Sequence, residues 1–289
     1  MSAARVVAQA KVNLFLHVLA REASGYHQLE TLFQRLGLGD DVRLRAGVRG
    51  RTLDCRGADV GPVERNLAWR AALAYAAAAG WPDGFAIEID KRIPVGGGLG
   101  GGSADAGAVL RALDALAPQP LGRRLIRVAA RLGSDVPFLT LDWLTALGWS
   151  RGERLLRMTT LDSLPVLLAV PPFGVATADA YQWLAEDRGA WAPWAGAVDP
   201  MELGDWTRLA PLVGNDFESA VEARQPSLRE IRERLGASGA LLARLSGSGS
   251  TVFGVFADPA AAASAGTALV VPTVLTRTAS SVVPVTVIR

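Results

Sequence analysis

A glycine-rich run constrains the fold of this chain more than any other feature of its sequence. Six of the seven residues from 96 to 102 are glycine, and the exception is Leu99. The run follows an alternating stretch at 85–89 that predicts a half-buried strand, and it precedes apolar residues at helical spacing from 106 to 116. Because so many glycines raise the entropic cost of folding, the backbone here is expected to approach something closely.

A glycine loop between a strand and a helix is well suited to bind phosphate. Such a loop points backbone N–H groups and a helix N-terminus into one concavity, and both attract anions. The alternatives are a flexible linker or a tight packing turn. Linkers usually lack hydrophobic order on both sides, whereas strong elements flank this run, so the pattern favours a phosphate-binding loop.

Three familiar nucleotide-loop classes do not fit the run. A Walker A motif ends in Gly-Lys-Ser/Thr, but here Gly102 precedes Ser103 directly. The spacing Gly96-x-Gly98-x-x-Gly101 satisfies the dinucleotide pattern only because a glycine run fits almost any glycine pattern, and the run does not follow the first strand of the chain. The His-Arg-Asp and Asp-Phe-Gly signatures of protein kinases are both absent from the sequence.

Composition excludes several classes of function. The 289 residues are enough for about two domains of roughly 150 residues. A formal net charge of +2 and scattered arginines argue against a nucleic-acid polymer as partner. No apolar run of about 18 residues predicts a membrane span. The single cysteine, Cys55, excludes an internal disulfide and favours the cytoplasm. Only two of the 30 basic residues are lysines, Lys11 and Lys91.

The order of predicted elements indicates an α+β protein in two halves that meet near residue 150. Alternating apolar residues predict strands in four regions, which are the first 45 residues, 85–89, 164–170 and 251–256. Helical spacing predicts helices at 66–79, 106–116, 123–132 and 227–235. Ser227 and Glu230 have the spacing of a capping box at the start of the last of these. The tryptophan-rich stretch 183–206 has no periodicity and predicts an irregular excursion.

Three segments resemble the GHMP family of small-molecule kinases. They are the glycine loop at 94–103, an N-terminal segment at 10–14 and a serine-glycine segment at 245–253. The resemblance implies the two-domain α+β fold of that family. We therefore expect a ribosomal-protein-S5-like ATP domain at residues 1–152 and a ferredoxin-like substrate domain at residues 153–289, with the active site in the cleft between them.

Five blocks in order resemble one branch of this family more narrowly, and they lie at 10–16, 25–33, 89–94, 132–138 and 245–253. That branch uses ATP and Mg²⁺ to phosphorylate the 2-hydroxyl of a cytidine diphosphate ester of a branched sugar alcohol, in the non-mevalonate pathway to isoprenoid precursors. Two alternatives stay open. One is another GHMP kinase, acting on mevalonate or homoserine, and the other is a non-catalytic nucleotide-binding protein. Residues 183–206 have no counterpart in the family.

The resemblance places Lys11 and Asp135 in the catalytic centre. A carboxylate beside a cation suits an alcohol substrate, because the carboxylate can accept or orient the hydroxyl proton while the cation supplies positive charge. Without the resemblance, Lys11 would be interpreted as a solvent-facing or snorkelling lysine. Asp135, between a turn and Pro137, would be interpreted as a turn or capping acid.

The resemblance also assigns residues to ATP. This group comprises Asn66, Lys91, Pro94, Val95, Gly96, Gly97, Gly98, Leu99, Gly100, Gly101, Gly102, Ser103 and Ala104. Ser103 is in addition a candidate ligand for the Mg²⁺ that accompanies ATP. The family usually has a second serine at the position of Ala104, so no role is expected for a second hydroxyl.

A third group of residues is assigned to the substrate, and it comprises Asn13, Tyr26, His27, Thr177 and Tyr181. By resemblance, Tyr26 and Tyr181 sandwich the cytosine while His27 reaches the edge of the base. The expected partner is therefore a small molecule rather than a nucleic-acid polymer or a membrane. We further expect a monomer or a weak homodimer.

Overall fold

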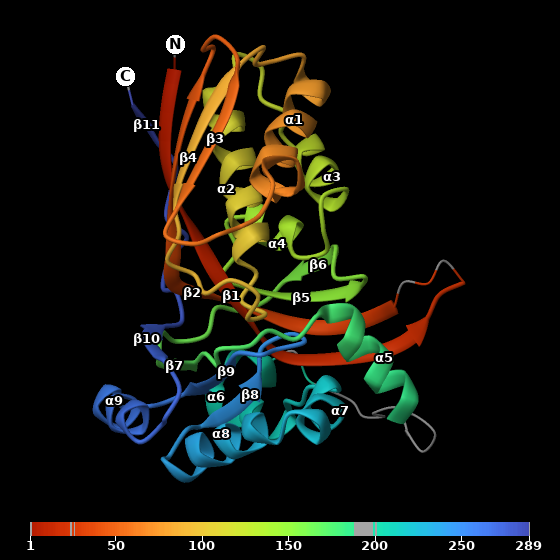
Figure 1. Cartoon of the computed structure of the whole chain (residues 1–289), viewed down its shortest axis with the longest axis vertical. Coiled ribbons are helices and arrows are strands. Elements are labelled where there is room, and N and C mark those ends of the chain that lie inside the picture. Colours follow the sequence, from red (N-terminus) through yellow and green to blue (C-terminus); the bar gives the residue numbers. More distant parts are fainter. Residues whose placement is uncertain (1, 24, 26, 188–198, 200, 289) are drawn as a thin grey trace.

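The computed structural model describes residues 2–23, 25, 27–187, 199 and 201–288. The central element of the fold is a long hairpin of two 20-residue antiparallel strands, β1 (Ser2–Arg21) and β2 (His27–Ala46). The hairpin runs from the upper half of the molecule into the lower half (Figure 1). The prediction of strands in the first 45 residues is confirmed.

The hairpin is the centre of a seven-stranded sheet. Its strands follow the order β11–β1–β2–β4–β3, and β5 pairs with the other end of β2 and with β6. Strands β3 and β4 run parallel, and the other strand pairs that the structure describes in this sheet are antiparallel. The further strands are β3 (Arg51–Arg56), β4 (Phe85–Asp90), β5 (Thr145–Ser150), β6 (Arg154–Arg157) and β11 (Thr286–Ile288).

Four helices cover one face of this sheet (Figure 1). They are α1 (Leu67–Ala79), α2 (Gly101–Leu116), α3 (Arg124–Ala130) and α4 (Val136–Thr140), and the short 3-10 turn η1 (Val63–Arg65) precedes α1. Helix α1 begins where Asn66 Oδ1 accepts from the Ala68 amide at 2.8 Å, and it ends at the left-handed Gly80. The predicted helix at 66–79 is confirmed.

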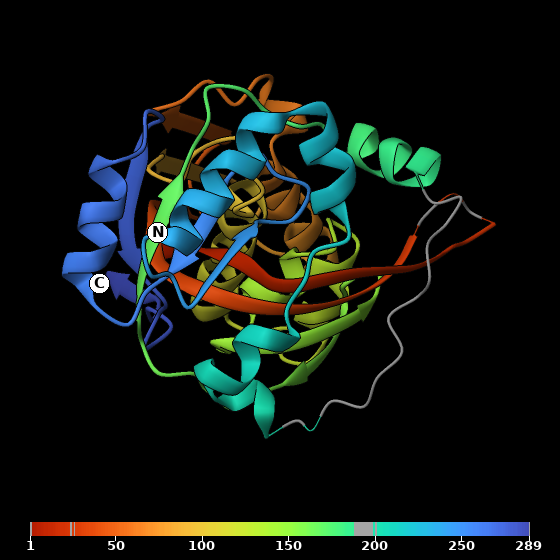
Figure 2. The ribbon, with the colours of Figure 1, turned by 90° about the horizontal axis from the view of Figure 1, so that it is seen from below.

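The second half of the chain forms a four-stranded antiparallel sheet in the order β10–β7–β9–β8. Helices α7, α8 and α9 pack beside it in the lower half of the molecule, as the view from below also shows (Figure 2). The elements are β7 (Pro165–Ala169), α7 (Phe217–Arg224), α8 (Pro226–Ala237), β8 (Leu242–Leu245), β9 (Val252–Val255), α9 (Pro259–Thr267) and β10 (Thr273–Arg277). The succession β7–α8–β8–β9–α9–β10 with this strand order is ferredoxin-like, so the predicted fold class is confirmed.

Between β7 and α7 the chain makes a helical excursion. It contains α5 (Thr177–Asp187), η3 (Glu202–Gly204), α6 (Trp206–Leu209) and η4 (Ala210–Leu212). Trp183 lies in α5 and Trp206 in α6, so both ends of the stretch predicted to be irregular are helical. Residues 188–198 and 200 of that stretch lie outside the described residues.

The predicted capping box at Ser227 is wrong. Helix α8 begins one residue earlier, at Pro226, and no side chain caps it. A proline in the first turn lacks the amide that a cap would satisfy and already has a helical φ, which explains this start.

The predicted domain boundary after residue 152 remains a prediction. Two strands from beyond that residue, β6 and β11, join the seven-stranded sheet by pairing with β5 and β1. Within the described residues, no helix combines the length and apolar character that crossing a membrane requires.

Candidate active site

Lys11 lies in β1 where the strand is irregular. The pairing register with β2 shifts between Gln9 and Lys11 and again between Asn13 and Phe15, so two bulges flank this segment. Lys11 Nζ donates a hydrogen bond to Asn13 Oδ1 at 2.7 Å, and the lysine side chain is only 4% exposed. Lys11 is therefore not the solvent-facing residue that its strand position alone would suggest.

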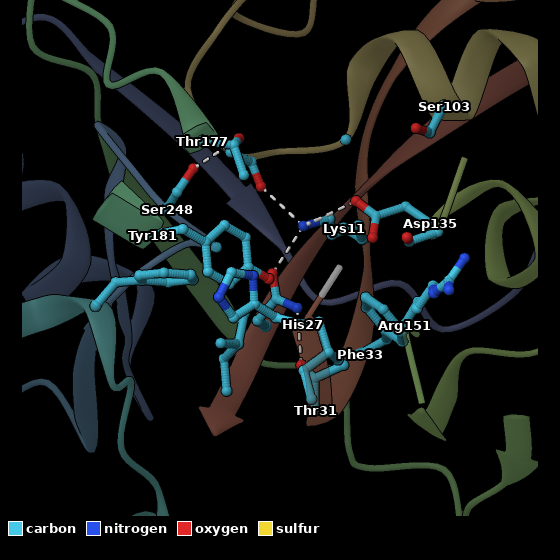
Figure 3. Close-up of a pocket in the computed structure, with 18 of the residues that line it drawn as sticks. Lys11, His27, Thr31, Phe33, Ser103, Asp135, Arg151, Thr177, Tyr181 and Ser248 are labelled. Atoms are coloured by element: carbon cyan, nitrogen blue, oxygen red, sulfur yellow. Dashed lines mark hydrogen bonds and ion pairs between the residues drawn. The ribbon is translucent and has the colours of Figure 1, made fainter. Parts of the chain in front are cut away.

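Asp135 occupies the N-terminal end of α4, yet its side chain makes no capping hydrogen bond. Asp135 Oδ2 lies instead 3.3 Å from Lys11 Nζ, and the Asp135 side chain is 28% exposed (Figure 3). Lys11 Nζ also donates to the carbonyl of Gly98 at 3.0 Å. The ammonium thus connects a carboxylate that is open to a cavity with the glycine loop.

The glycine loop packs against the turn at residues 246–251 so closely that side chains would not fit. A Cβ on Gly98, whose φ is +78°, would lie 2.0 Å from the carbonyl oxygen of Ser246. A Cβ on Gly97 would lie 2.3 Å from Thr251 Oγ1. The Thr251 amide donates to the Gly97 carbonyl at 3.2 Å and Ser246 Oγ donates to the Gly98 carbonyl at 3.0 Å. Glycine is required here because two backbone segments meet.

The loop lines a cavity of about 500 Å³. Twelve of the thirteen residues assigned to ATP line it, which are Asn66, Lys91, Pro94, Val95, Gly96, Gly97, Gly98, Leu99, Gly100, Gly101, Gly102 and Ser103. Ala104 does not, because its side chain points into the core and is 1% exposed. Its contact with a nucleotide is therefore not supported.

Lys91 lines this cavity but its ammonium is already paired. Lys91 Nζ forms ion pairs with Asp40 and, at 2.7 Å, with Asp105 Oδ2, and all three side chains are buried. Burial opposes the charge on Lys91, but the two carboxylates outweigh it and raise its pKa. For Asp105 the largest effect is burial, which disfavours the charged carboxylate and raises its pKa to about 7. Lys91 therefore links the end of β4, which precedes the loop, to α2, which follows it.

A second cavity, also of about 500 Å³, adjoins the first. Five residues line both cavities, namely Gly98, Gly100, Ser103, Thr177 and Ser248. Lys11, Asn13, Asp135, His27 and Tyr181 line the second cavity (Figure 3). The structure thus brings both catalytic candidates and four of the five predicted substrate residues together.

The aromatic side of the second cavity differs from the predicted sandwich. His27 and Tyr181 stack directly on each other, with ring centroids 4.1 Å apart and planes at 10°. Tyr181 also meets Phe217 edge-to-face at 4.9 Å. Tyr26 lies outside the described residues, so its stacking on a base remains a prediction. Thr177, another of the predicted substrate residues, forms a hydrogen bond between its Oγ1 and Ser248 Oγ at 3.1 Å.

Three further residues of this cavity carried no sequence prediction, and they are Thr31, Phe33 and Arg151. Thr31 Oγ1 accepts from Asn13 Nδ2 at 2.8 Å, and the guanidinium of Arg151 pairs with Glu22 at 2.5 Å. Thr31 and Phe33 belong to the block at 25–33 that resembles the family, so the sequence did point to these two residues. Arg151 lies in a segment that follows the family only roughly, and nothing in the sequence singled it out.

Comparison with known proteins decides the family. The N-terminal domain model of the GHMP kinases matches residues 66–142 and the C-terminal model matches residues 197–270. A 4-diphosphocytidyl-2-C-methyl-D-erythritol kinase from Pelotomaculum thermopropionicum is 41% identical over 257 residues, which cover 87% of this chain and 88% of the relative. The chain belongs to the GHMP kinase family.

Other members of the GHMP kinase family agree with this result. A relative with the same description from Synechococcus sp. is 39% identical over 92% of this chain and 89% of its own length. The crystal structure of a 4-(cytidine 5'-diphospho)-2C-methyl-D-erythritol kinase is 35% identical, superposes with a TM-score of 0.78, and covers 94% of this chain and 98% of the relative. Homoserine kinase from Cytophaga hutchinsonii, 18% identical with a TM-score of 0.71 over 99% of this chain and 97% of that one, shares the fold.

Proposed function

We propose that this protein transfers the γ-phosphoryl group of ATP to the 2-hydroxyl of 4-(cytidine 5'-diphospho)-2-C-methyl-D-erythritol, a step of the non-mevalonate (MEP) pathway of isoprenoid precursor biosynthesis. Relatives with that printed activity, 39% and 41% identical over most of the chain, support the substrate. The observation that supports the proposal is the Lys11–Asp135 pair, which lines the second cavity, while Lys11 Nζ also donates to the carbonyl of Gly98, a residue that lines both cavities.

The glycine-loop cavity suits the triphosphate. Loop amides and the N-terminus of α2, which begins at Gly101, provide hydrogen-bond donors and positive potential for phosphate oxygens. The ester of the substrate occupies the second cavity, with its base toward His27 and Tyr181. This places the hydroxyl and the γ-phosphate on either side of the residues that both cavities share.

Asp135 and Lys11 divide the chemistry between them. As the hydroxyl oxygen bonds to the γ-phosphorus and the bond to the ADP oxygen breaks, the hydroxyl proton passes to the Asp135 carboxylate or is oriented by it. Lys11 fixes the carboxylate and offers its positive charge to the transferring group. A non-catalytic binding protein has no need of such a pair, which disfavours that alternative.

Mg²⁺ fits this site as a companion of ATP. Among the described residues, no group of three His, Cys, Asp or Glu side chains could hold a metal ion. Mg²⁺ needs no such cage, because one or two protein oxygens plus substrate phosphates commonly hold it. Ser103 and Asp135 both line the second cavity and offer suitable oxygens. When bound, the ion neutralises phosphate charge.

The surroundings of the reaction follow from the same proposal. Both reactants are small molecules, and neither a nucleic-acid polymer nor a membrane takes part. We place the enzyme in the cytoplasm, as a monomer or weak homodimer.

The test is ADP release in the presence of three alcohols offered separately: 4-(cytidine 5'-diphospho)-2-C-methyl-D-erythritol, mevalonate and homoserine. We expect turnover with the cytidyl compound alone. Turnover with mevalonate or homoserine but not with the cytidyl compound would identify another GHMP kinase. ATP binding without turnover of any of them would identify a non-catalytic nucleotide-binding protein.

A further inference from the structure

Arg35, on β2, is a buried cation that contacts α4, the helix whose N-terminal end is Asp135. It is 1% exposed and is the largest of the fully buried side chains in the described part of the protein. Burial lowers its pKa to about 9, and repulsion from Arg111 contributes, so the guanidinium is still charged at neutral pH. Lys11 and Lys91, whose ammonium groups are also buried, pair with carboxylates. In the described residues, Arg35 donates only to main-chain carbonyls.

These carbonyls belong to the end of α4 and the segment just after it. The guanidinium donates to Phe138 at 3.0 Å, to Leu141 at 2.9 Å and to Trp143 at 3.2 Å. A cation at the last carbonyls of a helix interacts favourably with acceptors at its C-terminal end, and here it adds to the bond that the Phe138 carbonyl accepts from the Leu141 amide at 3.2 Å. Helix α4 has only five residues, and the Leu139 amide donates to the Asp135 carbonyl at 3.1 Å. Arg35 therefore anchors the far end of the single short helix that carries Asp135.

A stack of rings connects the same guanidinium to the other member of the pair. Arg35 lies 5.1 Å from the ring centroid of Phe138, and Phe138 stacks on Phe33 at 5.0 Å with planes at 14°. Lys11 Nζ lies 5.9 Å from the centroid of Phe33. Both rings are buried, so their positions are fixed by packing. Arg35 therefore contacts both α4, which follows Asp135, and the Phe138–Phe33 stack, which lies beside Lys11.

We propose that Arg35 is a positioning residue for phosphoryl transfer, which holds Asp135 through α4 and Lys11 through the Phe138–Phe33 stack. Arg35 lines neither of the two cavities. A buried charge is costly, and apolar residues of similar volume often fill such a space at no loss of stability. What the cation adds here is a fixed geometry between two side chains that meet at 3.3 Å. This inference rests on the proposed function for its kinetic test only.

The kinetic test compares Arg35→Met with Arg111→Met. Arg111, on α2, is a half-buried arginine whose guanidinium also donates to a main-chain carbonyl, but its acceptor is Val283. We expect Tm to change by a similar, small amount in both variants, whereas only Arg35→Met lowers kcat, by about 10- to 100-fold, because a misplacement of about 1 Å can cost 100-fold. The KM values for ATP and for the cytidyl substrate should change less than about threefold. Equal kcat in Arg35→Met and wild type, after correction for the folded fraction, would overturn the proposal.

Two further variants keep the test decisive if Arg35→Met does not fold. Arg35→Lys keeps the charge but has fewer donors, so it should recover part of kcat. Phe138→Leu removes the ring between Arg35 and Phe33, and Phe85→Leu removes an equally buried ring that packs on Trp69. We expect kcat to fall in Phe138→Leu and to stay near wild type in Phe85→Leu. Equal kcat in these two would overturn the proposal.

A spectroscopic readout separates this inference from the proposed function. Because the chain has two lysines, labelling with [¹³Cε]lysine gives two side-chain signals, and Lys11→Met assigns them. We expect Arg35→Met, which adds no lysine, to move the Lys11 signal and leave the Lys91 signal in place, with no substrate present. If wild type fails to turn over the cytidyl compound but the Lys11 signal moves, the proposed function fails and the positioning role stands. An unmoved Lys11 signal would overturn the positioning role.

Discussion

Lys11 and Lys91 are alike in burial and in their position beside the glycine loop, but their carboxylate partners differ. Both adjoin the glycine loop, and their side chains are 4% and 3% exposed. Lys91 has two buried carboxylates, whereas Lys11 has one, Asp135, which opens onto a cavity. The exposure of the partner carboxylate, rather than the burial of the lysine, therefore distinguishes the pair that we propose to be catalytic from the one that we propose to be structural.

The strongest way to break this comparison is Asp135→Asn. The amide keeps the shape of the side chain but cannot accept the hydroxyl proton or balance Lys11, so we expect kcat to fall by about 10²- to 10⁴-fold. The Kd for ATP and the Tm should stay close to wild type, because Asp135 is partly exposed. Single-turnover kinetics measure the rate, an ATP-binding titration measures the Kd, and thermal denaturation measures the Tm. Wild-type activity in this variant would remove Asp135 from the catalytic role.

The structural lysine is tested by Lys91→Met. This change leaves Asp40 and Asp105 buried without their cation, which we expect to cost about 3–5 kcal/mol of unfolding free energy. Urea denaturation followed by circular dichroism measures it. The matched control is Lys11→Met, whose remaining carboxylate faces a cavity and should cost less. An equal loss in the two variants would mean that partner exposure does not distinguish the two sites.

The Lys91 cluster should also make stability depend on pH. The pKa of Asp105 is about 7 in the folded protein and 3.8 in its unperturbed state. Between these values the folded state binds a proton that the unfolded state has lost, so the free energy of unfolding falls as pH rises from about 4 to 7, by at most about 1.4 kcal/mol per pH unit. Urea titrations at several pH values should show a flatter profile for Asp105→Asn. An identical slope in that variant would exclude Asp105 as the source.

The smallest expected effect concerns the far side of the Lys11 cavity. Removing the ring in Tyr181→Ala should raise the KM for the cytidyl substrate about tenfold, because stacking of a base on an aromatic ring contributes about 1–3 kcal/mol. The KM for ATP, bound beside Lys91, should not change. Tyr26→Ala should act in the same direction. Steady-state kinetics that show parallel changes in both KM values would indicate that the two cavities are not separate.

Sequence patterns predicted most of this molecule because its motifs are local. The glycine loop, the strand at 85–89 and the helix at 66–79 each depend on neighbours in the chain, and the structure has all three. The same patterns carried no sign of Asp40, which meets Lys91 from a distant strand, or of Arg35 beneath α4. Such partners are chosen by packing between elements, so no spacing in the sequence reveals them.

The direct contact of His27 with Tyr181 illustrates the same limit. The family resemblance indicated that both residues belong to one site, but it implied a base between two tyrosines. Two flat rings that stack on each other remove apolar ring surface from water, which stabilises this contact. The contact depends on packing between β2 and α5, which no spacing in the sequence reveals.

The pairing of β11 with β1 has a consequence for how the protein is made. Residues 286–288 pair with residues 3–5, so this strand of the first half receives its neighbour from beyond the ferredoxin-like half. All of the ferredoxin-like half is synthesised in between. The sheet that holds the glycine loop and Lys11 thus keeps this edge of β1 uncovered until the chain beyond that half has been made.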